Sequence, residues 1–316
     1  MNSPPWPRLG VGAGSLANAG GEPAFLATVR TAWQAGIRFF DTSAFYLGGE
    51  SEKRLGEALE TVPRDDLVIS TKVGRYQNHT GSSIDPHSRQ SWFDYSAEAT
   101  EQSVLRSLDR LKVKRLDAVF VHDLDHRLCG SRYQELLEAA LTGAYPVLRK
   151  MKADGIVGAV GVAAMDWRAC LQFAQVTELD LVMPAGEYSL LRNTSAPLLD
   201  YCVDFNIGWI AASPFNSGIL ATGARDDAFY DMRPATPAVL AQVERLDGVC
   251  RRHGVPLAAA AVQYPGRHPA VASVVFGAKS VAEFEETQAL YAFPLPGAFW
   301  SEIDDLIARS GNWEGL

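Results

Sequence analysis

The chain has 316 residues, 47% of them hydrophobic, and its 29 lysines and arginines against 37 aspartates and glutamates leave a formal net charge of −8. This composition is typical of a globular protein with a substantial core, and the acidic balance without a basic run argues against nucleic acid or an anionic membrane as a partner. No apolar run is long enough for a membrane span, and the N-terminal segment lacks the basic start and apolar centre of a signal peptide.

The chain opens with a glycine-rich stretch, Leu9-Gly10-Val11-Gly12-Ala13-Gly14-Ser15-Leu16, which predicts a short strand followed by a loop. Its glycines partly match the dinucleotide-binding fingerprint. That motif needs a differently placed third glycine and a helix that begins at once, and we expect neither here. The stretch therefore does not favour a Rossmann-type site.

A buried strand over residues 37–40 ends on a carboxylate, Asp41, after a helical pattern between residues 25 and 33. The strand is short, apolar and rich in β-preferring side chains. A glycine-containing loop then carries Tyr46, and Ser51 is the predicted N-cap of a helix over 52–60. A carboxylate and a phenol therefore follow a buried strand, where a loop can direct them at a ligand.

The next two predicted strands also end on chemically active side chains. An apolar strand over 67–73 carries Lys72 near its end, and a strand over 116–122 ends on His122. A long polar loop over 74–95 lies between them. Long loops inside compact domains are usually functional, and we expect Arg75 and Trp92 of this loop to contact substrate.

Strand and helix patterns alternate to the end of the chain. The further helices are expected at 96–111, 133–153, 196–204 and up to 253, with others from 166 and from 280, and the further strands at 157–162, 179–183, 208–213 and 272–276. Residues 214–236 are expected to be irregular. Eight strand-then-helix units without a composition break favour a single-domain (β/α)8 TIM barrel over residues 1–316, with its active site at the carboxyl ends of the strands.

Four proton-active groups meet on one patch of such a barrel: Asp41, Tyr46, Lys72 and His122. A phenol is a poor acid or base at neutral pH, but a buried ammonium beside it stabilises the phenolate, and a carboxylate keeps that ammonium charged. A histidine opposite can hydrogen-bond the substrate oxygen. The set suits proton transfer at a carbonyl or carbinol oxygen.

Other interpretations of these residues remain open. Asp41 and Lys72 alone would be read as a structural ion pair, and Tyr46 alone as packing. The run His122-Asp123-Leu124-Asp125-His126 has ligand-rich spacing, which would fit a metal-dependent barrel hydrolase. No second ligand pattern follows at the other strand ends, so we expect no metal.

Several motifs together resemble the aldo-keto reductase family. They are Gly-Ile-Arg-Phe-Phe-Asp-Thr-Ser (36–43), Gly-Glu-Ser-Glu (49–52), Ser-Thr-Lys-Val-Gly (70–74), Val-His-Asp (121–123), Glu-Tyr-Ser-Leu-Leu (187–191) and Ala-Ser-Pro-Phe-Asn-Ser-Gly-Ile-Leu (212–220). The resemblance covers nearly the whole chain. It implies a catalytic tetrad of Asp41, Tyr46, Lys72 and His122, and a nicotinamide cofactor extended across the barrel mouth.

Within that family the chain is similar to the dehydrogenases that oxidise L-fucose, D-arabinose or L-galactose. Thr-Lys-Val-Gly-Arg-Tyr (71–76) and the tail Gly-Asn-Trp-Glu-Gly-Leu (311–316) carry this narrower resemblance, which makes Trp313 a candidate substrate contact. Pyridoxal dehydrogenases of the same family are similar as well.

The chain departs from the family pattern at the expected cofactor contacts. Ala163, Ala164 and Ala185 replace the serine, asparagine and glutamine that usually hold the carboxamide. Gly277 and Glu283 fall where NADP-using members place a lysine and an arginine. A carboxylate there would repel a 2′-phosphate, so we expect NAD, with NADP as the alternative. The other expected cofactor contacts are Ser213, Phe215, Gly218, Leu220, Ser280 and Glu286.

The resulting hypothesis is a cytoplasmic, NAD-dependent dehydrogenase that oxidises an aldose at C1 to its lactone. Four widely spaced cysteines without a Cys-x-x-Cys pair are typical of reduced thiols and favour that compartment. The alternatives are oxidation of pyridoxal to its lactone, a general carbonyl reductase, and a cofactor-binding redox sensor with little turnover. The sequence leaves the oligomeric state open.

Overall fold

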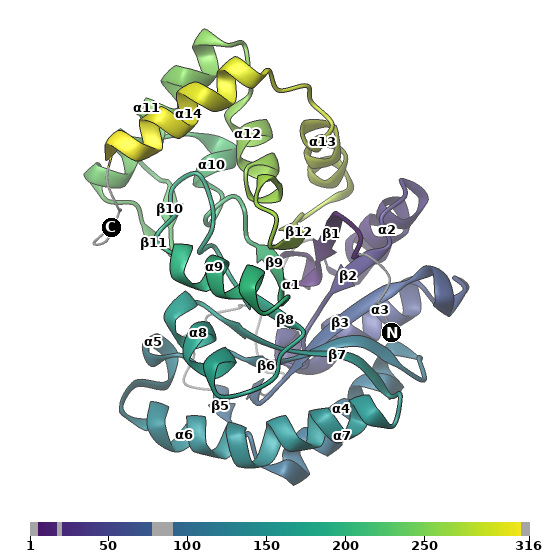
Figure 1. Ribbon diagram of the computed structural model, residues 1–316. Helices are drawn as coiled ribbons and strands as arrows, with labels where there is room; N and C mark the ends of the chain where they lie inside the picture. Colours follow the sequence, from purple (N-terminus) through teal and green to yellow (C-terminus); the bar gives the residue numbers. More distant parts are fainter. Residues whose placement is uncertain (1–5, 18–20, 78–90, 311–316) are drawn as a thin grey trace.

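Eight parallel strands close into a barrel that carries helices on its outside (Figure 1). The computed structural model describes residues 6–17, 21–77 and 91–310. The strands follow the order β1-β12-β9-β8-β7-β6-β3-β2 around the barrel, so neighbours in space are neighbours in the sequence, apart from short inserted elements. The predicted (β/α)8 TIM barrel is confirmed.

The barrel strands are β1 (Leu9–Gly12), β2 (Phe39–Asp41), β3 (Val68–Val73), β6 (Leu116–His122), β7 (Val157–Ala164), β8 (Leu181–Pro184), β9 (Gly208–Ala212) and β12 (Val271–Gly277). The longer helices around them are α2 (Gly21–Gln34), α3 (Glu50–Ala58), α4 (Ala97–Leu111), α6 (Tyr133–Ala139), α7 (Tyr145–Ala153), α8 (Trp167–Gln175), α9 (Ala196–Asp204), α11 (Pro237–Arg252), α12 (Leu257–Gln263), α13 (Val281–Tyr291) and α14 (Gly297–Ser310). A π-helical turn, Ala140–Ala144, joins α6 to α7, so the predicted helix over 133–153 is one continuous helical stretch.

Shorter elements lie between these units. They are the helices α1 (Ala13–Ala17), α5 (His126–Cys129) and α10 (Ile219–Thr222), the 3-10 turns Tyr46–Gly49, Arg64–Asp66, Gly130–Arg132 and Pro265–Arg267, and the antiparallel pairs β4 (Arg75–Gln77) with β5 (Ser91–Phe93) and β10 (Phe229–Tyr230) with β11 (Arg233–Pro234).

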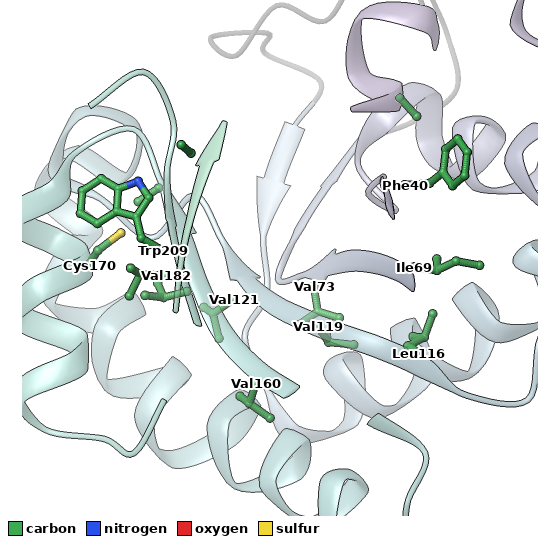
Figure 2. Packing of buried hydrophobic residues seen from close by; sticks show 14 of the residues in the cluster. Phe40, Ile69, Val73, Leu116, Val119, Val121, Val160, Cys170, Val182 and Trp209 are labelled. Carbon is green, nitrogen blue, oxygen red and sulfur yellow. The ribbon is translucent and has the colours of Figure 1, made fainter. Parts of the chain in front are cut away.

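Alternate side chains of each strand serve two cores. Phe39 and Phe120 belong to the cluster inside the barrel, whereas their chain neighbours Phe40 and Val119 pack outward against the helices. Figure 2 shows this outer layer, in which Val119 and Val121 project from one strand beside Val73 of the next. Because the side-chain period of a strand is two, one apolar run can fill both layers and present its last residue at the barrel mouth.

Three predictions about local structure were wrong. A short helix, α1, follows β1 where we expected a loop. Helix α3 begins at Glu50, and its N-cap is Gly49 with a φ of 94°, a conformation that glycine adopts without steric cost. Ser51 does not cap the helix, because it is buried and its hydroxyl is 3.0 Å from that of Thr42.

Parts of both stretches that were expected to be loops form regular elements. The stretch 74–95 contains the β4–β5 ladder, which aligns Arg75 with Phe93. The stretch 214–236 contains α10 and the β10–β11 hairpin. Both pairs of strands stand at the end of the barrel where the parallel strands finish, so they shape the mouth.

Candidate active site

Asp41 and Lys72 form a buried ion pair at the carboxyl ends of β2 and β3. The Lys72 Nζ lies 2.6 Å from Asp41 Oδ2 and donates a second hydrogen bond to the carbonyl of Thr42 at 2.8 Å. The Ser70 hydroxyl donates to the other Asp41 oxygen at 2.6 Å. Both carboxylate oxygens therefore have partners, as a buried charge requires.

Tyr46 stands over this pair. Its ring centroid is 4.9 Å from Lys72 Nζ, and the ring meets that of His122 edge-on at 6.0 Å. The chain turns sharply after it, since Leu47, Gly48 and Gly49 all have positive φ. Gly14 lies against the opposite side of the phenol, where an added Cβ would come within 3.4 Å of the ring. The loop thus holds Tyr46 between the ammonium and the backbone of α1.

Two opposing effects act on the pKa of Tyr46. Burial raises the pKa of Tyr46 above its usual value, and the Lys72 ammonium lowers the pKa by less than burial raises it. Burial lowers the pKa of Lys72, but Asp41 and Tyr46 raise it further, so the net pKa of the amine is raised. At neutral pH the raised pKa of Tyr46 keeps a phenol beside a charged lysine, and the lysine charge favours the phenolate, the form that takes up a proton.

His122 is the last residue of β6 and is held from several directions. Its Nδ1 is 3.1 Å from the Ser43 hydroxyl and its Nε2 is 3.3 Å from Asp123 Oδ2. The Tyr95 hydroxyl donates to the His122 carbonyl at 2.6 Å, and the Tyr95 ring occupies the space that a side chain at Gly74 would need. Burial lowers the pKa of His122 to about 3, so the imidazole is neutral at physiological pH.

Arg75 and Asp123 form a second ion pair beside this histidine. The Arg75 Nη1 is 2.5 Å from Asp123 Oδ2, and the Arg75 side chain is almost fully buried. The guanidinium also stacks 4.2 Å from the centroid of the Phe45 ring. Burial raises the pKa of Asp123, but His122 and Arg75 together lower it further, so the group is a carboxylate.

One cavity of about 440 Å³ joins these groups at the barrel mouth. The four predicted catalytic residues line it together with the predicted substrate contact Arg75. The three alanines at the expected carboxamide contacts line it too, with the methionines Met165, Met183 and Met232 nearby. Trp92 is 45% exposed and lines a separate hollow beside Tyr76, and Trp313 lies outside the described residues.

The chain matches proteins of known type along most of its length. The sequence model of the Aldo/keto reductase family matches residues 8–308. The chain belongs to the aldo/keto reductase family. It is 35% identical to the D-threo-aldose 1-dehydrogenase of a Pseudomonas species, over 94% of this chain and 93% of that protein. It is 31% identical to the pyridoxal 4-dehydrogenase of Microbacterium luteolum, over 88% and 86%. The glycerol dehydrogenase of Gluconobacter oxydans, at 21% identity, has the same fold with a TM-score of 0.77 over 98% of this chain and 93% of that one.

The predicted cofactor residues of this aldo/keto reductase fall into three groups. Ser213 and Gly277 line the cavity, and a Cβ at Gly277 would lie 2.3 Å from the Ser15 hydroxyl. Of the others, Gly218 is the N-cap of α10 with a φ of 95°, and Leu220 is fully buried. Phe215 packs against the core between barrel and helices and against a further buried cluster that includes Leu220.

The last three predicted cofactor residues lie at the start of α13. Ser280 caps this helix by accepting from the Glu283 amide at 3.2 Å, and Glu286 is exposed. The Glu283 carboxylate accepts from the Lys279 amide at 2.8 Å, and the Lys279 side chain lines the cavity. The cavity therefore extends from the four predicted catalytic residues to Lys279, next to the N-terminus of α13.

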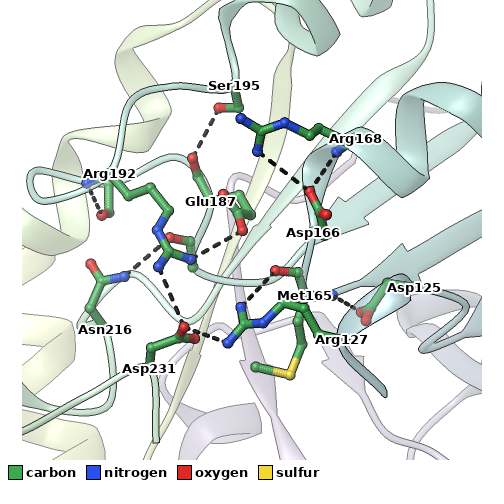
Figure 3. Close-up of polar contacts among 12 residues, drawn as sticks. Asp125, Arg127, Met165, Asp166, Arg168, Glu187, Arg192, Ser195, Asn216 and Asp231 are labelled. Atoms are coloured by element: carbon green, nitrogen blue, oxygen red, sulfur yellow. Dashed lines mark hydrogen bonds and ion pairs between the residues drawn. The ribbon is translucent and has the colours of Figure 1, made fainter. Parts of the chain in front are cut away.

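A network of arginines and carboxylates surrounds the neighbouring loops (Figure 3). Arg127 contacts Asp231 at 2.5 Å and the carbonyl of Met165 at 3.4 Å, and Arg192 contacts Glu187 at 3.1 Å. These contacts link the segments after β6, β7, β8 and β9. They tie the β10–β11 hairpin, whose turn contains Asp231 and Met232, to the edge of the cavity.

The metal hypothesis finds no geometric support. Asp125 caps α5 and accepts from the Met165 amide, while the ring of His126 lies 3.6 Å from that of Tyr133. Within the described ranges no cluster of three or more histidine, cysteine or acidic side chains is arranged to hold an ion. Nor does any helix in those ranges have the length and apolar character needed to cross a membrane.

Sequence reasoning missed several residues of the site. Ser43 and Asp123 belong to motifs that carried the family resemblance, yet we assigned them no role. Lys279 lies two residues after Gly277, the last residue of β12, and lines the cavity, but it belongs to none of the motifs that carried the resemblance. Tyr95 carried no local signal, since its contact with His122 spans 27 residues.

Proposed function

We propose that this protein is an NAD-dependent aldose 1-dehydrogenase, which oxidises a sugar of the L-fucose, D-arabinose or L-galactose type to its lactone. The observation that carries the proposal is the Tyr46 phenol beside the buried Lys72–Asp41 pair, in a cavity that also contains the Arg75–Asp123 pair. A cavity with paired charges on two walls suits a polyol better than an apolar substrate. The aldose and pyridoxal dehydrogenases among the relatives support the same class of reaction.

In this proposal Tyr46 takes the proton from the anomeric hydroxyl as the bond from C1 to hydrogen breaks. Lys72 stabilises the phenolate that this step requires, and Asp41 keeps the lysine charged and in place. The neutral His122 orients the same oxygen. A bound nicotinamide would supply the acceptor for the hydride that leaves C1, and the remaining C1–O bond becomes the lactone carbonyl.

The described residues fit such a cofactor. The cavity passes the glycines of β1 and α1 and reaches Gly277, where the missing side chain makes room for the Ser15 hydroxyl, a polar group on the cavity wall. The part of the cofactor that lies farther from the catalytic residues would contact Ser213, Gly277 and Lys279. Ala163, Ala164 and Ala185 offer no side-chain amide to the nicotinamide ring, so backbone groups would have to position the carboxamide. NAD is preferred in this proposal because of the Glu283 carboxylate near the rim.

The test is the appearance of reduced-nicotinamide absorbance with NAD and with NADP, across the three sugars and pyridoxal. We expect turnover of at least one sugar, with a higher kcat/KM for NAD than for NADP. Turnover of pyridoxal alone would support the same oxidation to a lactone, with pyridoxal instead of a sugar as the substrate. Tight cofactor binding without turnover in either direction would leave the redox-sensor function instead.

Carbonyl reduction is the second candidate. The raised pKa of Tyr46 favours it, because a neutral phenol is the form that donates a proton to a developing alkoxide. The same assay run backwards, with reduced cofactor and small aldehydes, measures this activity. A kcat/KM for aldehyde reduction that exceeds sugar oxidation at pH 7 would make the protein a reductase.

A further inference from the structure

Asp123 lines the cavity with a strained backbone directly next to a candidate catalytic group. It follows His122 directly, and its φ of 56° places a non-glycine residue in the left-handed region. Such a conformation is sterically unfavourable and persists where the surroundings impose it, often at functional sites. Here the Asp123 amide donates to the carbonyl of Ala163 at 2.6 Å, which holds the turn at the end of β6.

The two carboxylate oxygens of Asp123 differ in what surrounds them. Oδ2 receives Arg75 Nη1 at 2.5 Å and lies 3.3 Å from His122 Nε2. Oδ1 has no hydrogen-bond partner among the residues that the structure describes. The Asp123 side chain is 13% exposed, and Asp123 lines the cavity that contains Tyr46. A charged acceptor therefore faces the substrate space with one oxygen available.

We infer that Asp123 binds the hydroxyl on the carbon next to the reacting carbon, which for an aldose is the C2 hydroxyl. The inference rests on the proposed function, because it places the C1 oxygen between Tyr46 and His122. The carboxylate of Asp123 adjoins the His122 ring, since Oδ2 lies 3.3 Å from His122 Nε2, and Oδ1 belongs to the same group. A substrate that meets His122 with its C1 oxygen thus brings a neighbouring oxygen to Asp123.

The chemistry of the carboxylate decides which neighbouring oxygen that is. In the ring form of an aldose, C1 is flanked by the ring oxygen and by C2 with its hydroxyl. An ionised carboxylate only accepts hydrogen bonds, and the ring oxygen has no proton to donate. Only the C2 hydroxyl can pair with Oδ1, so Asp123 selects the direction in which the ring lies and the configuration at C2. Arg75 is a positioning residue in this scheme, since it holds Oδ2 and leaves Oδ1 without a partner among the described residues.

The experiment compares a sugar with its 2-deoxy analogue in two forms of the enzyme. For D-arabinose the analogue is 2-deoxy-D-ribose, and D-ribose is the C2 epimer. We expect wild-type kcat/KM to fall by about 10- to 100-fold when the C2 hydroxyl is absent, as for a hydrogen bond to a charged group. In Asp123→Asn that ratio should shrink to a few-fold, because D-arabinose loses more activity than 2-deoxy-D-ribose does, and discrimination against D-ribose should shrink with it.

The ratio of the two sugars is an internal control for folding, since damage to the protein lowers both activities alike. Asp117→Asn is the matched variant. Asp117 lies at the amino end of the same strand, where its Oδ2 pairs with Arg64 at 2.6 Å, so this change removes an equivalent carboxylate far from the cavity. We expect it to keep the wild-type ratio.

Three results would overturn the inference. A wild-type enzyme that oxidises both sugars equally would refute it and leave the proposed function standing. An unchanged ratio in Asp123→Asn would do the same. If the wild type oxidises no aldose with either cofactor, the proposed function fails, and this inference fails with it.

Discussion

Two lysine–aspartate pairs at opposite ends of the barrel have nearly the same geometry. At the carboxyl ends of the strands, Lys72 Nζ lies 2.6 Å from Asp41, and both side chains are at most 6% exposed. At the amino ends, Lys152 Nζ lies 2.5 Å from Asp180, and these side chains are 30% and 34% exposed. In each pair the aspartate has a further donor, the Ser70 hydroxyl in the first and the Val160 amide in the second.

The difference between the pairs is their access to water, and it decides what each can do. Water screens the exposed pair, so its contribution to stability is about 0.2–1 kcal/mol. The buried pair acts through a lower dielectric, where one charge strongly affects the protonation of a neighbour. Tyr46 stands beside the buried pair alone. The same two residue types therefore form a structural ion pair at the amino ends of the strands, and part of a candidate proton-transfer site at the carboxyl ends.

The largest effect is expected from Tyr46→Phe, which leaves both ion pairs intact and removes the group that the buried pair acts on. A lost general acid–base residue lowers rates by about 10²- to 10⁴-fold. We expect kcat to fall by that factor while the Kd of the cofactor, measured by quenching of protein fluorescence, stays within about threefold.

Tyr201→Phe is the matched control, because the Tyr201 hydroxyl donates only to the carbonyl of Ala174 on the outside of the barrel. It should keep wild-type kcat. If Tyr46→Phe retains wild-type turnover, another group transfers the proton. The buried Lys72–Asp41 pair would then have no role in proton transfer through Tyr46.

Lys72→Met and Lys152→Met test the two pairs directly. The first leaves the Asp41 carboxylate buried without its counter-ion, a change that typically lowers the free energy of unfolding by about 3–5 kcal/mol. The second should lower it by less than about 1 kcal/mol. Urea unfolding of both variants measures these values.

The same two variants should differ in activity. We expect kcat to fall by about 10²-fold in Lys72→Met, because the phenolate loses its stabilising charge, and to stay unchanged in Lys152→Met. Equal losses of stability or of activity in the two variants would contradict the conclusion that burial gives the Lys72–Asp41 pair its larger effect.

The pH dependence of sugar oxidation sharpens the comparison further. Oxidation needs the Tyr46 phenolate, and the raised pKa of Tyr46 keeps the phenol protonated at neutral pH. The phenolate fraction therefore grows as pH rises, and kcat should increase by up to about tenfold per pH unit between pH 7 and 9. Aldehyde reduction uses the protonated form and should change little over that range. A rate of sugar oxidation that is flat or falls with pH would mean that Tyr46 is not the base.

The positions of these groups follow from the sequence more readily than their chemical states. Asp41, Lys72 and His122 could be placed together because parallel strands end at one edge, and the apolar runs before them mark those ends. The sign of the Tyr46 shift could not be predicted, because burial and the Lys72 charge act in opposite directions and only the folded contacts give their balance.

Contacts made across separate loops were not predictable either. Arg75 meets Asp123 because the β4–β5 ladder and the left-handed turn after β6 converge, and neither has a clear local signal. Ser51 was misassigned as an N-cap because a serine before Glu52 is typical of helix starts. The positive φ of Gly49 starts the helix earlier and leaves the Ser51 hydroxyl to pair with Thr42.

The smallest effect is expected at Glu283, an exposed carboxylate near the cavity rim and the counterpart of the buried charges discussed above. Its oxygen accepts from the Lys279 amide, so it has a capping role whatever its effect on the cofactor. Glu283→Gln keeps an acceptor and removes the charge, and Glu283→Arg reverses the charge. We expect the ratio of kcat/KM for NADP over NAD to rise a few-fold in the first and about tenfold in the second.

Solvent screening gives this prediction a second readout. An effect that arises from an exposed charge should shrink as ionic strength rises, whereas a lost helix cap should lower stability at any salt concentration. If neither variant changes the ratio of kcat/KM for NADP over NAD, Glu283 only caps the helix. The preference between NAD and NADP would then depend on Lys279, whose side chain lines the cavity beside it.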